Sequence, residues 1–167
     1  MKIITLFLAS FICIQLFACN ITEEAKPADT SNTDSNQANP TNPSNADTST
    51  NSKKMKVTIG ANVFTATLND NATTAAFKAK LPMTINMKEL NGNEKFFDFA
   101  FNLPTNASNL GTIQNGDLMM YGANTLVLFY KTFSTSYSYT RLGRIDNPSG
   151  LATALGTGNV TVKFGLE

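Results

Sequence analysis

The segment that most constrains the fold of this chain runs from residue 113 to residue 131. It holds two short apolar runs, 118–121 and 125–130, which are joined by Gly122-Ala123-Asn124 and preceded by Gly116-Asp117. Glycine, asparagine and aspartate at these places are typical of the turns of a tight β-hairpin. Because both runs are apolar on both faces, neither strand is expected at a solvated edge. We therefore place this hairpin at the centre of a small β-barrel or sandwich.

Residues 1–18 have the pattern of a secretory signal peptide. Lys2 provides a basic start, and the apolar run that follows is too short for a stable transmembrane helix. The run ends in Leu16-Phe17-Ala18-Cys19, which resembles the bacterial lipobox, in which cleavage precedes a cysteine that receives a diacylglycerol. We therefore predict lipid attachment at Cys19. The alternative is an ordinary signal peptide cut nearby, with Cys19 incidental.

The predicted anchor also indicates a location. A lipid on Cys19 would make a membrane the first partner of this protein, at the bacterial cell envelope. Asn20 follows the cysteine, and an aspartate that would suggest inner-membrane retention is absent from that position. We expect the protein at the outer membrane, facing either the periplasm or the outside.

Residues 19–54 are rich in asparagine, threonine, serine and proline, and Ile21 is their only large apolar residue. Such a stretch cannot bury enough surface to fold, so we predict a disordered tether that carries a domain at residues 55–167. The chain has two cysteines. Cys13 would leave with the signal peptide and Cys19 would be acylated, so the domain has no thiol for a disulfide, a nucleophile or a metal site.

Short β-strands make up most of the predicted domain. Residues 56–59 and 63–68 form a hairpin, and a helix begins at Asn71 and ends before Pro82. Ala72, Ala75, Ala76 and Ala79 recur at helical spacing, extended by Phe77, and are expected to form the buried face. The alternating residues of four further segments predict strands: 83–88, 95–102, 137–145 and 160–166. Residues 148–155 are expected to form a short helix or a helical turn.

Three phenylalanines two apart, Phe97, Phe99 and Phe101, are interpreted as core. About eight short strands with one or two short helices make a barrel with a capping helix.

Residues spread along the whole domain resemble the bacterial cyclophilin-like domain family. They are Phe64-Thr65-Ala66-Thr67-Leu68, Leu81-Pro82-Met83-Thr84, Glu94-Lys95, Gly116-Asp117-Leu118, Leu128-Phe129-Tyr130, Tyr139-Thr140-Arg141-Leu142-Gly143-Arg144 and Gly150-Leu151. The resemblance implies a mainly β fold, a closed eight-stranded cyclophilin-like β-barrel with one or two short capping helices. It carries no catalytic signature, and we expect no catalytic residue.

Prolyl isomerase activity of the cyclophilin type is the alternative. True cyclophilins present a catalytic arginine in a Phe-His-Arg type strand, beside an apolar proline pocket. The nearest analogue here, Phe96-Phe97-Asp98-Phe99, has an aspartate in place of a cation, and the chain has no histidine. Arg141 and Arg144 could serve from another strand, although their surroundings do not match the active-site pattern of the family.

Several other classes of function are disfavoured by composition. A formal net charge of +1 without runs of basic residues argues against nucleic acid as a partner. Without histidine or a domain cysteine, a Ser-His-Asp triad, a Cys-His pair and an ordinary zinc site are unavailable, and we expect neither metal nor cofactor. Glu89, Glu94 and Asp98 could serve as general acids or bases, but we interpret them as a solvated strand end and turn.

The candidate ligand-binding surface is aromatic and basic. Tyr137, Tyr139 and Arg141 share one face of a strand, Tyr121 and Tyr130 lie at the ends of the central hairpin strands, and Arg144 is near. The alternative is ordinary packing of the tyrosine rings. We predict a monomeric, non-catalytic binding or accessory module whose ligand is a peptide or a small molecule.

Overall fold

The computed structural model describes residues 52–167. The predicted signal peptide, the predicted lipid attachment at Cys19 and the tether up to residue 51 lie outside the described residues. The first strand begins at Lys54, at the end of the predicted tether.

Eleven strands and two short helices follow one another along the described segment. The strands are β1 (Lys54–Ile59), β2 (Asn62–Leu68), β3 (Met83–Leu90), β4 (Glu94–Asp98), β5 (Ser108–Asn109), β6 (Thr112–Ile113), β7 (Asp117–Tyr121), β8 (Thr125–Phe129), β9 (Phe133–Ser134), β10 (Ser138–Ile145) and β11 (Val160–Leu166). The helices are α1 (Ala72–Lys78) and α2 (Leu151–Leu155). Within residues 52–167, neither helix is long and apolar enough to cross a membrane.

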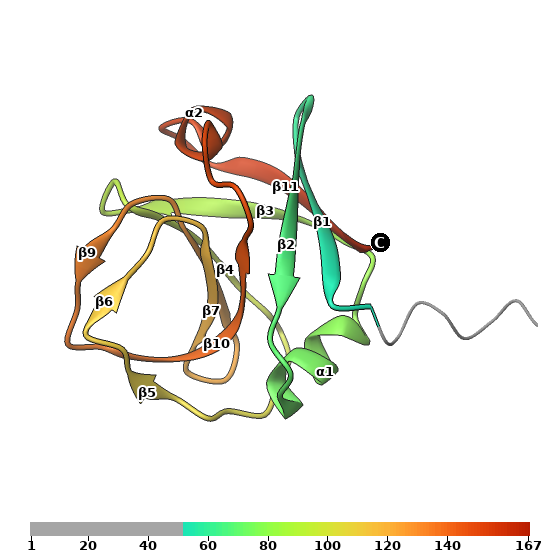
Figure 1. Cartoon of the computed structure of the whole chain (residues 1–167), viewed down its shortest axis with the longest axis vertical. Coiled ribbons are helices and arrows are strands. Elements are labelled where there is room, and N and C mark those ends of the chain that lie inside the picture. The colour runs from blue at the N-terminus through green and yellow to red at the C-terminus, as the bar shows by residue number, and fades with distance from the viewer. Residues whose placement is uncertain (1–51) are drawn as a thin grey trace, which may run out of the picture. The chain divides into compact units, whose positions relative to one another are not determined.

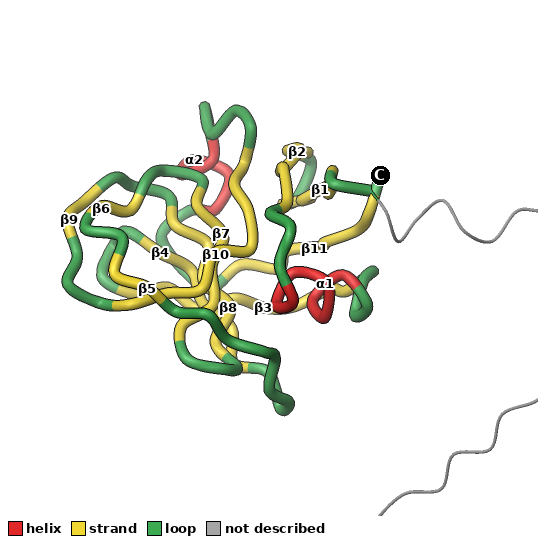
Figure 2. Tube along the Cα trace, turned by 60° about the horizontal axis from the view of Figure 1, so that its bottom comes forward, coloured by secondary structure: helices red, strands yellow, loops and turns green. Residues whose placement is uncertain are grey.

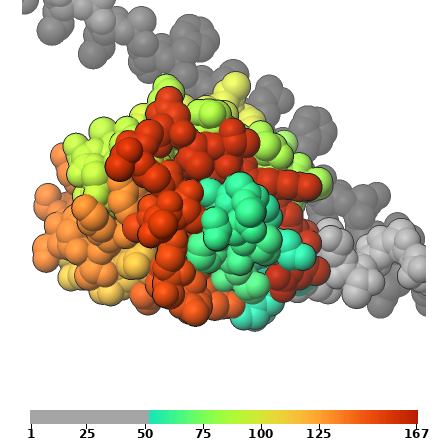
Figure 3. Space-filling model, turned by 90° about the horizontal axis from the view of Figure 1, so that it is seen from above, coloured from blue at the N-terminus to red at the C-terminus, as the bar shows by residue number. Residues whose placement is uncertain are grey.

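Eight of the strands form a closed antiparallel barrel. Their order is β2-β1-β11-β3-β4-β8-β7-β10, and β10 pairs again with β2, which closes the ring. Figure 3 shows the β1–β2 hairpin in teal beside the red C-terminal segment, with which β1 pairs through β11. The predicted fold class is therefore confirmed: the domain is mainly β, with an eight-stranded closed barrel and two short helices.

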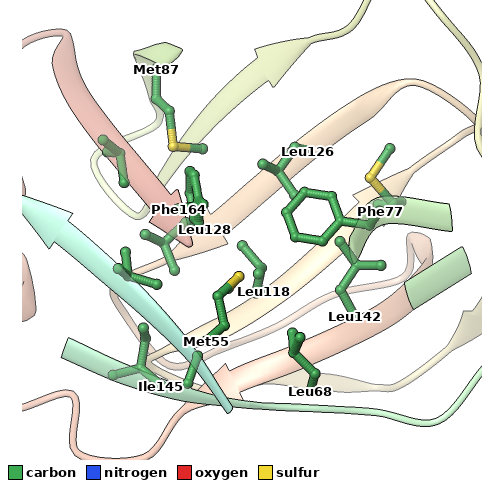
Figure 4. Packing of buried hydrophobic residues seen from close by; sticks show 14 of the residues in the cluster. Met55, Leu68, Phe77, Met87, Leu118, Leu126, Leu128, Leu142, Ile145 and Phe164 are labelled. Atoms are coloured by element: carbon green, nitrogen blue, oxygen red, sulfur yellow. The ribbon is translucent and has the colours of Figure 1, made fainter. Parts of the chain in front are cut away.

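Alternating residues of the barrel strands fill its interior. On β1, for example, Met55, Val57 and Ile59 are buried. Figure 4 shows Met55 pointing toward Leu118 and Leu128 of the central hairpin. Both helices pack on this inner cluster, α1 through Phe77 and α2 through two leucines, and Figure 1 shows them at the bottom and the top of the barrel.

The central hairpin has a second apolar face on the outside of the barrel. Met119, Val127 and Phe129 are buried there together with Ile113 and Tyr139. The small β6–β9 sheet covers this outer cluster, and Figure 1 shows it on the side of the barrel away from β1 and β2. The predicted position of β7 and β8 as internal strands, apolar on both faces, is confirmed.

The buried face of α1 differs from the prediction. Asn71 caps the helix as expected, since its side chain accepts a hydrogen bond from the Thr74 backbone N–H at 2.8 Å. However, the buried residues are Thr73, Thr74 and Phe77, and the predicted alanine stripe was wrong, because three of its four members are exposed. The threonine hydroxyls face the barrel because they donate hydrogen bonds to backbone carbonyls of other segments. Figure 2 shows the helix beside the barrel strands.

The predicted long strand at 95–102 is also shorter than expected. β4 ends at Asp98, and the chain then leaves the sheet, so that Phe101 is 37 % exposed and not in the core. Its ring stacks on Phe99, with 4.7 Å between the ring centroids. The ring of eight strands closes on itself within residues 52–167 and encloses a hydrophobic cluster, so we expect this segment to fold by itself.

Candidate ligand-binding groove

A groove of about 550 Å³ runs along the outer wall of the barrel. Its floor comes from β4 and β8, and its other side comes from residues 133–137 and from Tyr139. Because side chains alternate along a strand, Glu94, Phe96 and Asp98 of β4 point to the groove together. Lys95 and Phe97 lie on the opposite face of β4.

Three tyrosines form the aromatic wall of the groove. The rings of Tyr121 and Tyr137 meet edge to face, with 6.0 Å between their centroids, and Tyr139 lies 5.6 Å from Tyr121. Tyr139 is buried, whereas Tyr121 is 47 % and Tyr137 is 61 % exposed. Burial, together with the nearby negative charges of Glu94 and the other tyrosines, raises the pKa of Tyr139 to about 12. Tyr121 and Tyr137 therefore present unused aromatic surface on this wall.

Glu94 is a buried carboxyl group in the floor of the groove. It is 9 % exposed, and among the described residues its carboxylate has no hydrogen-bond or ion-pair partner. Burial raises the pKa of Glu94 to about 7, and the negative charge of Glu89 adds to the effect. A group of this kind exchanges a proton near neutral pH and lacks a counter-charge when it is ionised.

Further acceptor groups lie along the same groove. The side-chain oxygen Oδ1 of Asn93 is buried and has no hydrogen-bond partner within the described segment. Asp98 accepts a hydrogen bond from the Thr125 hydroxyl at 2.7 Å. Both charged residues that line the groove, Glu94 and Asp98, are acidic.

A second hollow, of about 490 Å³, lies beside α2. Here the Tyr130 hydroxyl donates a hydrogen bond to Glu89 Oε1 at 2.8 Å, and burial together with this bond raises the pKa of Tyr130 to about 12. Behind them, the fully buried Lys95 donates to Glu89 and to the carbonyls of Gly156 and Gly158. Burial would raise the pKa of Glu89, but the hydrogen bonds from Lys95 and Tyr130 outweigh it and the pKa is lowered. This cluster is internally satisfied and connects β3 and β4 to the loop after α2.

The structure separates the five residues that the sequence suggested for ligand binding. Tyr121 and Tyr139 meet in the groove, whereas Tyr130 lines the second hollow. Arg141 and Arg144 are exposed on β10 and line neither of these two cavities. Arg144 instead donates to the Asn115 carbonyl at 3.3 Å. The aromatic surface is therefore acidic where a basic one was expected.

The interpretation of Glu94 as part of a solvated strand end was wrong. The carboxylates of Glu89 and Glu94 belong to opposite faces of the sheet, since Glu89 pairs in register with Lys95 and Leu90 with Glu94. The spacing of two residues between Glu94, Phe96 and Asp98 indicated that they share one face of a strand. This spacing could not indicate that the face is buried, because the covering segment 133–137 lies far away in the sequence.

The chemistry available in the groove is recognition by acceptor oxygens and aromatic faces. In the described part of the chain, histidine, cysteine, aspartate and glutamate side chains form no group of three that could hold a metal ion.

These features define a class of protein: a closed antiparallel β-barrel domain with a ligand-sized groove on its outer wall. A family model described as the cyclophilin-like family matches residues 57–165. The chain belongs to this cyclophilin-like family, and the resemblance seen in the sequence is confirmed. A search of curated proteins and a search of solved structures each found no match.

Proposed function

We propose that this domain is a non-catalytic binding module whose ligand, a peptide or a small molecule, occupies the groove. The observation that carries the proposal is the groove itself. Its volume of about 550 Å³ lies within the range of about 300–1,000 Å³ that is typical of small-molecule sites, and it combines apolar walls with few polar groups. Phe96, Val127 and Phe133 supply the apolar surface. Glu94 supplies an acceptor without a partner among the described residues.

We further propose that the module is held at the bacterial envelope by a lipid on Cys19. The support for this is the sequence Leu16-Phe17-Ala18-Cys19 behind a basic, apolar leader. Several acyl chains, each contributing about 0.8 kcal/mol per buried methylene, would keep the protein on the membrane almost permanently. The outer membrane is the proposed location.

Binding is tested by amide NMR of residues 52–167 with a panel of short capped peptides and small aromatic fragments. We expect the shifted amides to lie in β4, β8 and residues 133–139, and Tyr121→Ala to weaken binding. Val63→Ala is the matched control, because Val63 is an exposed apolar residue on β2 and does not line the groove. Binders that all map outside the groove would contradict the proposal.

Anchoring is tested by growing bacteria that express the full chain with labelled palmitate. The wild-type protein should carry the label and sediment with membranes, and Cys19→Ser should abolish both. The Cys13→Ser variant is the control and should keep the label. An unlabelled, freely soluble wild-type chain would show that Cys19 is incidental.

A protease-coupled isomerisation assay distinguishes this module from a prolyl isomerase. We expect no rate above background, because the groove is acidic and both candidate arginines lie outside it. A rate that disappears in Arg141→Ala or Arg144→Ala would favour the isomerase.

A further inference from the structure

We propose that the groove binds small organic ammonium compounds, with Glu94 as the counter-charge and the three tyrosines around the cationic head and its apolar neighbour. This inference rests on the proposed function, since it names the chemical class of the ligand for that same groove.

Within residues 52–167, Glu94 lacks a counter-charge in the free protein. Glu94 is 9 % exposed and lines the groove, yet no described residue donates a hydrogen bond to its carboxylate. The carboxylate oxygens are not fully buried, so a ligand in the groove can reach them. A partly desolvated carboxylate gains from a donor and a counter-charge, and the other buried charge on β4, Lys95, is by contrast fully paired. An ammonium group brought by a ligand would supply the donors and the positive charge that Glu94 lacks.

The aromatic wall of the groove is suited to contact with a cation. A cation is attracted to the face of an aromatic ring when it lies within about 6 Å of the centroid. Tyr121 and Tyr137 keep about half of their surface free and stand against each other at the groove, next to the buried Tyr139. Rings of this kind suit the head of an organic cation and the hydrocarbon that carries it.

The charge of the groove lining favours a cationic ligand. The two charged residues that line the groove are both acidic. A lysine also lies near the rim: the Lys88 ammonium is 5.6 Å from the centroid of the Phe96 ring, which itself lines the groove. This contact shows that the outer face of β4 already accommodates a cation on an aromatic ring. An anionic ligand would add its negative charge to those of Glu94 and Asp98 in the groove.

Protonation of Glu94 makes the binding depend on pH. With the pKa of Glu94 near 7, the carboxylate form rises from about one-tenth at pH 6 to about nine-tenths at pH 8. If the ammonium pairs with the carboxylate, its affinity increases about tenfold over this interval. The other titratable or charged groups around Glu94 are Lys88 and Glu89 on β3, Asp98 on β4, and Tyr121, Tyr130, Tyr137 and Tyr139. Burial and nearby negative charge hold Tyr130 and Tyr139 neutral throughout.

Three compounds of the same shape test the inference: phenethylammonium, 2-phenylethanol and phenylacetate. Each is titrated into the folded segment 52–167 and followed by amide NMR at pH 6 and pH 8. We expect phenethylammonium to shift the groove residues most strongly, with the roughly tenfold gain toward pH 8, while the alcohol binds more weakly without a pH dependence. Phenylacetate should bind weakest.

Two variants complete the test. Glu94→Gln should remove the preference for the ammonium compound and its pH dependence. Asp70→Asn, which makes the same charge change at an exposed residue that does not line the groove, should keep both. If the three compounds bind the groove equally, or phenylacetate binds best, the ammonium inference is overturned and the binding module stands. If none of them shifts the groove residues, the ammonium inference fails, and the binding module is decided separately by the panel of peptides and fragments.

Discussion

Replacing Lys95 with methionine removes a buried charge that joins three parts of the barrel. The side chain is fully buried, and its ammonium donates to Glu89 on β3 and to the carbonyls of Gly156 and Gly158, at 2.9 and 2.6 Å, in the loop before β11. Methionine keeps most of the apolar stem and loses all three hydrogen bonds. The change therefore tests the charged contacts with little change in packing.

The expected loss in the free energy of unfolding depends on the acceptors that lose the Lys95 ammonium, namely Glu89 and the two glycine carbonyls. Removing one partner of a buried ion pair typically costs about 3–5 kcal/mol. Glu89 is 22 % exposed and keeps its bonds from Tyr130 and the Gly92 N–H, and the two glycines are exposed enough to take water instead. We therefore expect the lower end, about 3 kcal/mol. For a domain of this size that loss lowers Tm by about 12 °C.

Urea and thermal unfolding of residues 52–167, followed by circular dichroism, measure this loss. Lys163→Met is the matched control on β11, and its exposed side chain should change stability by less than about 0.5 kcal/mol. Adding Glu89→Gln to Lys95→Met should restore part of the loss, because it removes the charge left without a partner. A loss below about 1 kcal/mol for Lys95→Met would show that the buried ammonium contributes little to the stability of the barrel.

Three further changes probe the floor of the groove, the closure of the barrel and the face of α1. Glu94→Gln should raise the free energy of unfolding by up to about 3 kcal/mol near pH 8 and change it little near pH 4. The reason is that the pKa of Glu94 rises from 4.5 to about 7 on folding, so the wild-type domain loses stability as pH increases between these values. Urea titrations that give the same change at both pH values would contradict this. Gly143→Ala should cost about 2 kcal/mol or more, because a Cβ there would overlap a backbone carbonyl oxygen of β2, whereas Gly165→Ala has open space and should be near neutral in the same urea assay. Phe77→Ala should cost about 3–5 kcal/mol in thermal unfolding because Phe77 is buried, whereas the exposed Ala75→Ser should cost less than about 0.5 kcal/mol. The reverse order would show that the alanine face of α1 is the buried one.

Local patterns in the sequence were enough to predict the barrel. Turn residues around β7 and β8 and alternating residues on β1 and β3 predicted these strands. Because β7 and β8 are apolar on both faces, the internal position of the central hairpin was predicted as well. The face of α1 was missed for a physical reason. Alanine periodicity competed with two threonines whose hydroxyls find distant carbonyl acceptors, at Pro104 and Leu142, and those acceptors are set by the tertiary fold.

The groove was only partly predictable. Tyr121 and Tyr139 come together because the register of β7 and β10 places them on one outer face. Successive side chains along an extended chain point to opposite faces, so Tyr130 lies on the inner face while the preceding Phe129 lies on the outer one. The burial of Glu94 depends on residues 133–137, which fold over β4 from a distant part of the sequence. A strand-end glutamate next to a turn gives no local signal of that cover.

The role of Glu94 is measured by a carbon-13 NMR titration of its carboxyl group, with and without phenethylammonium. We predict a pKa near 7 in the free domain and a fall in this pKa when the ammonium compound is bound, because the bound cation stabilises the carboxylate. Glu94→Gln identifies the resonance by removing it. An ordinary glutamate pKa that does not change on adding the compound would contradict the claim that the groove holds an unpaired carboxylate awaiting a cationic ligand.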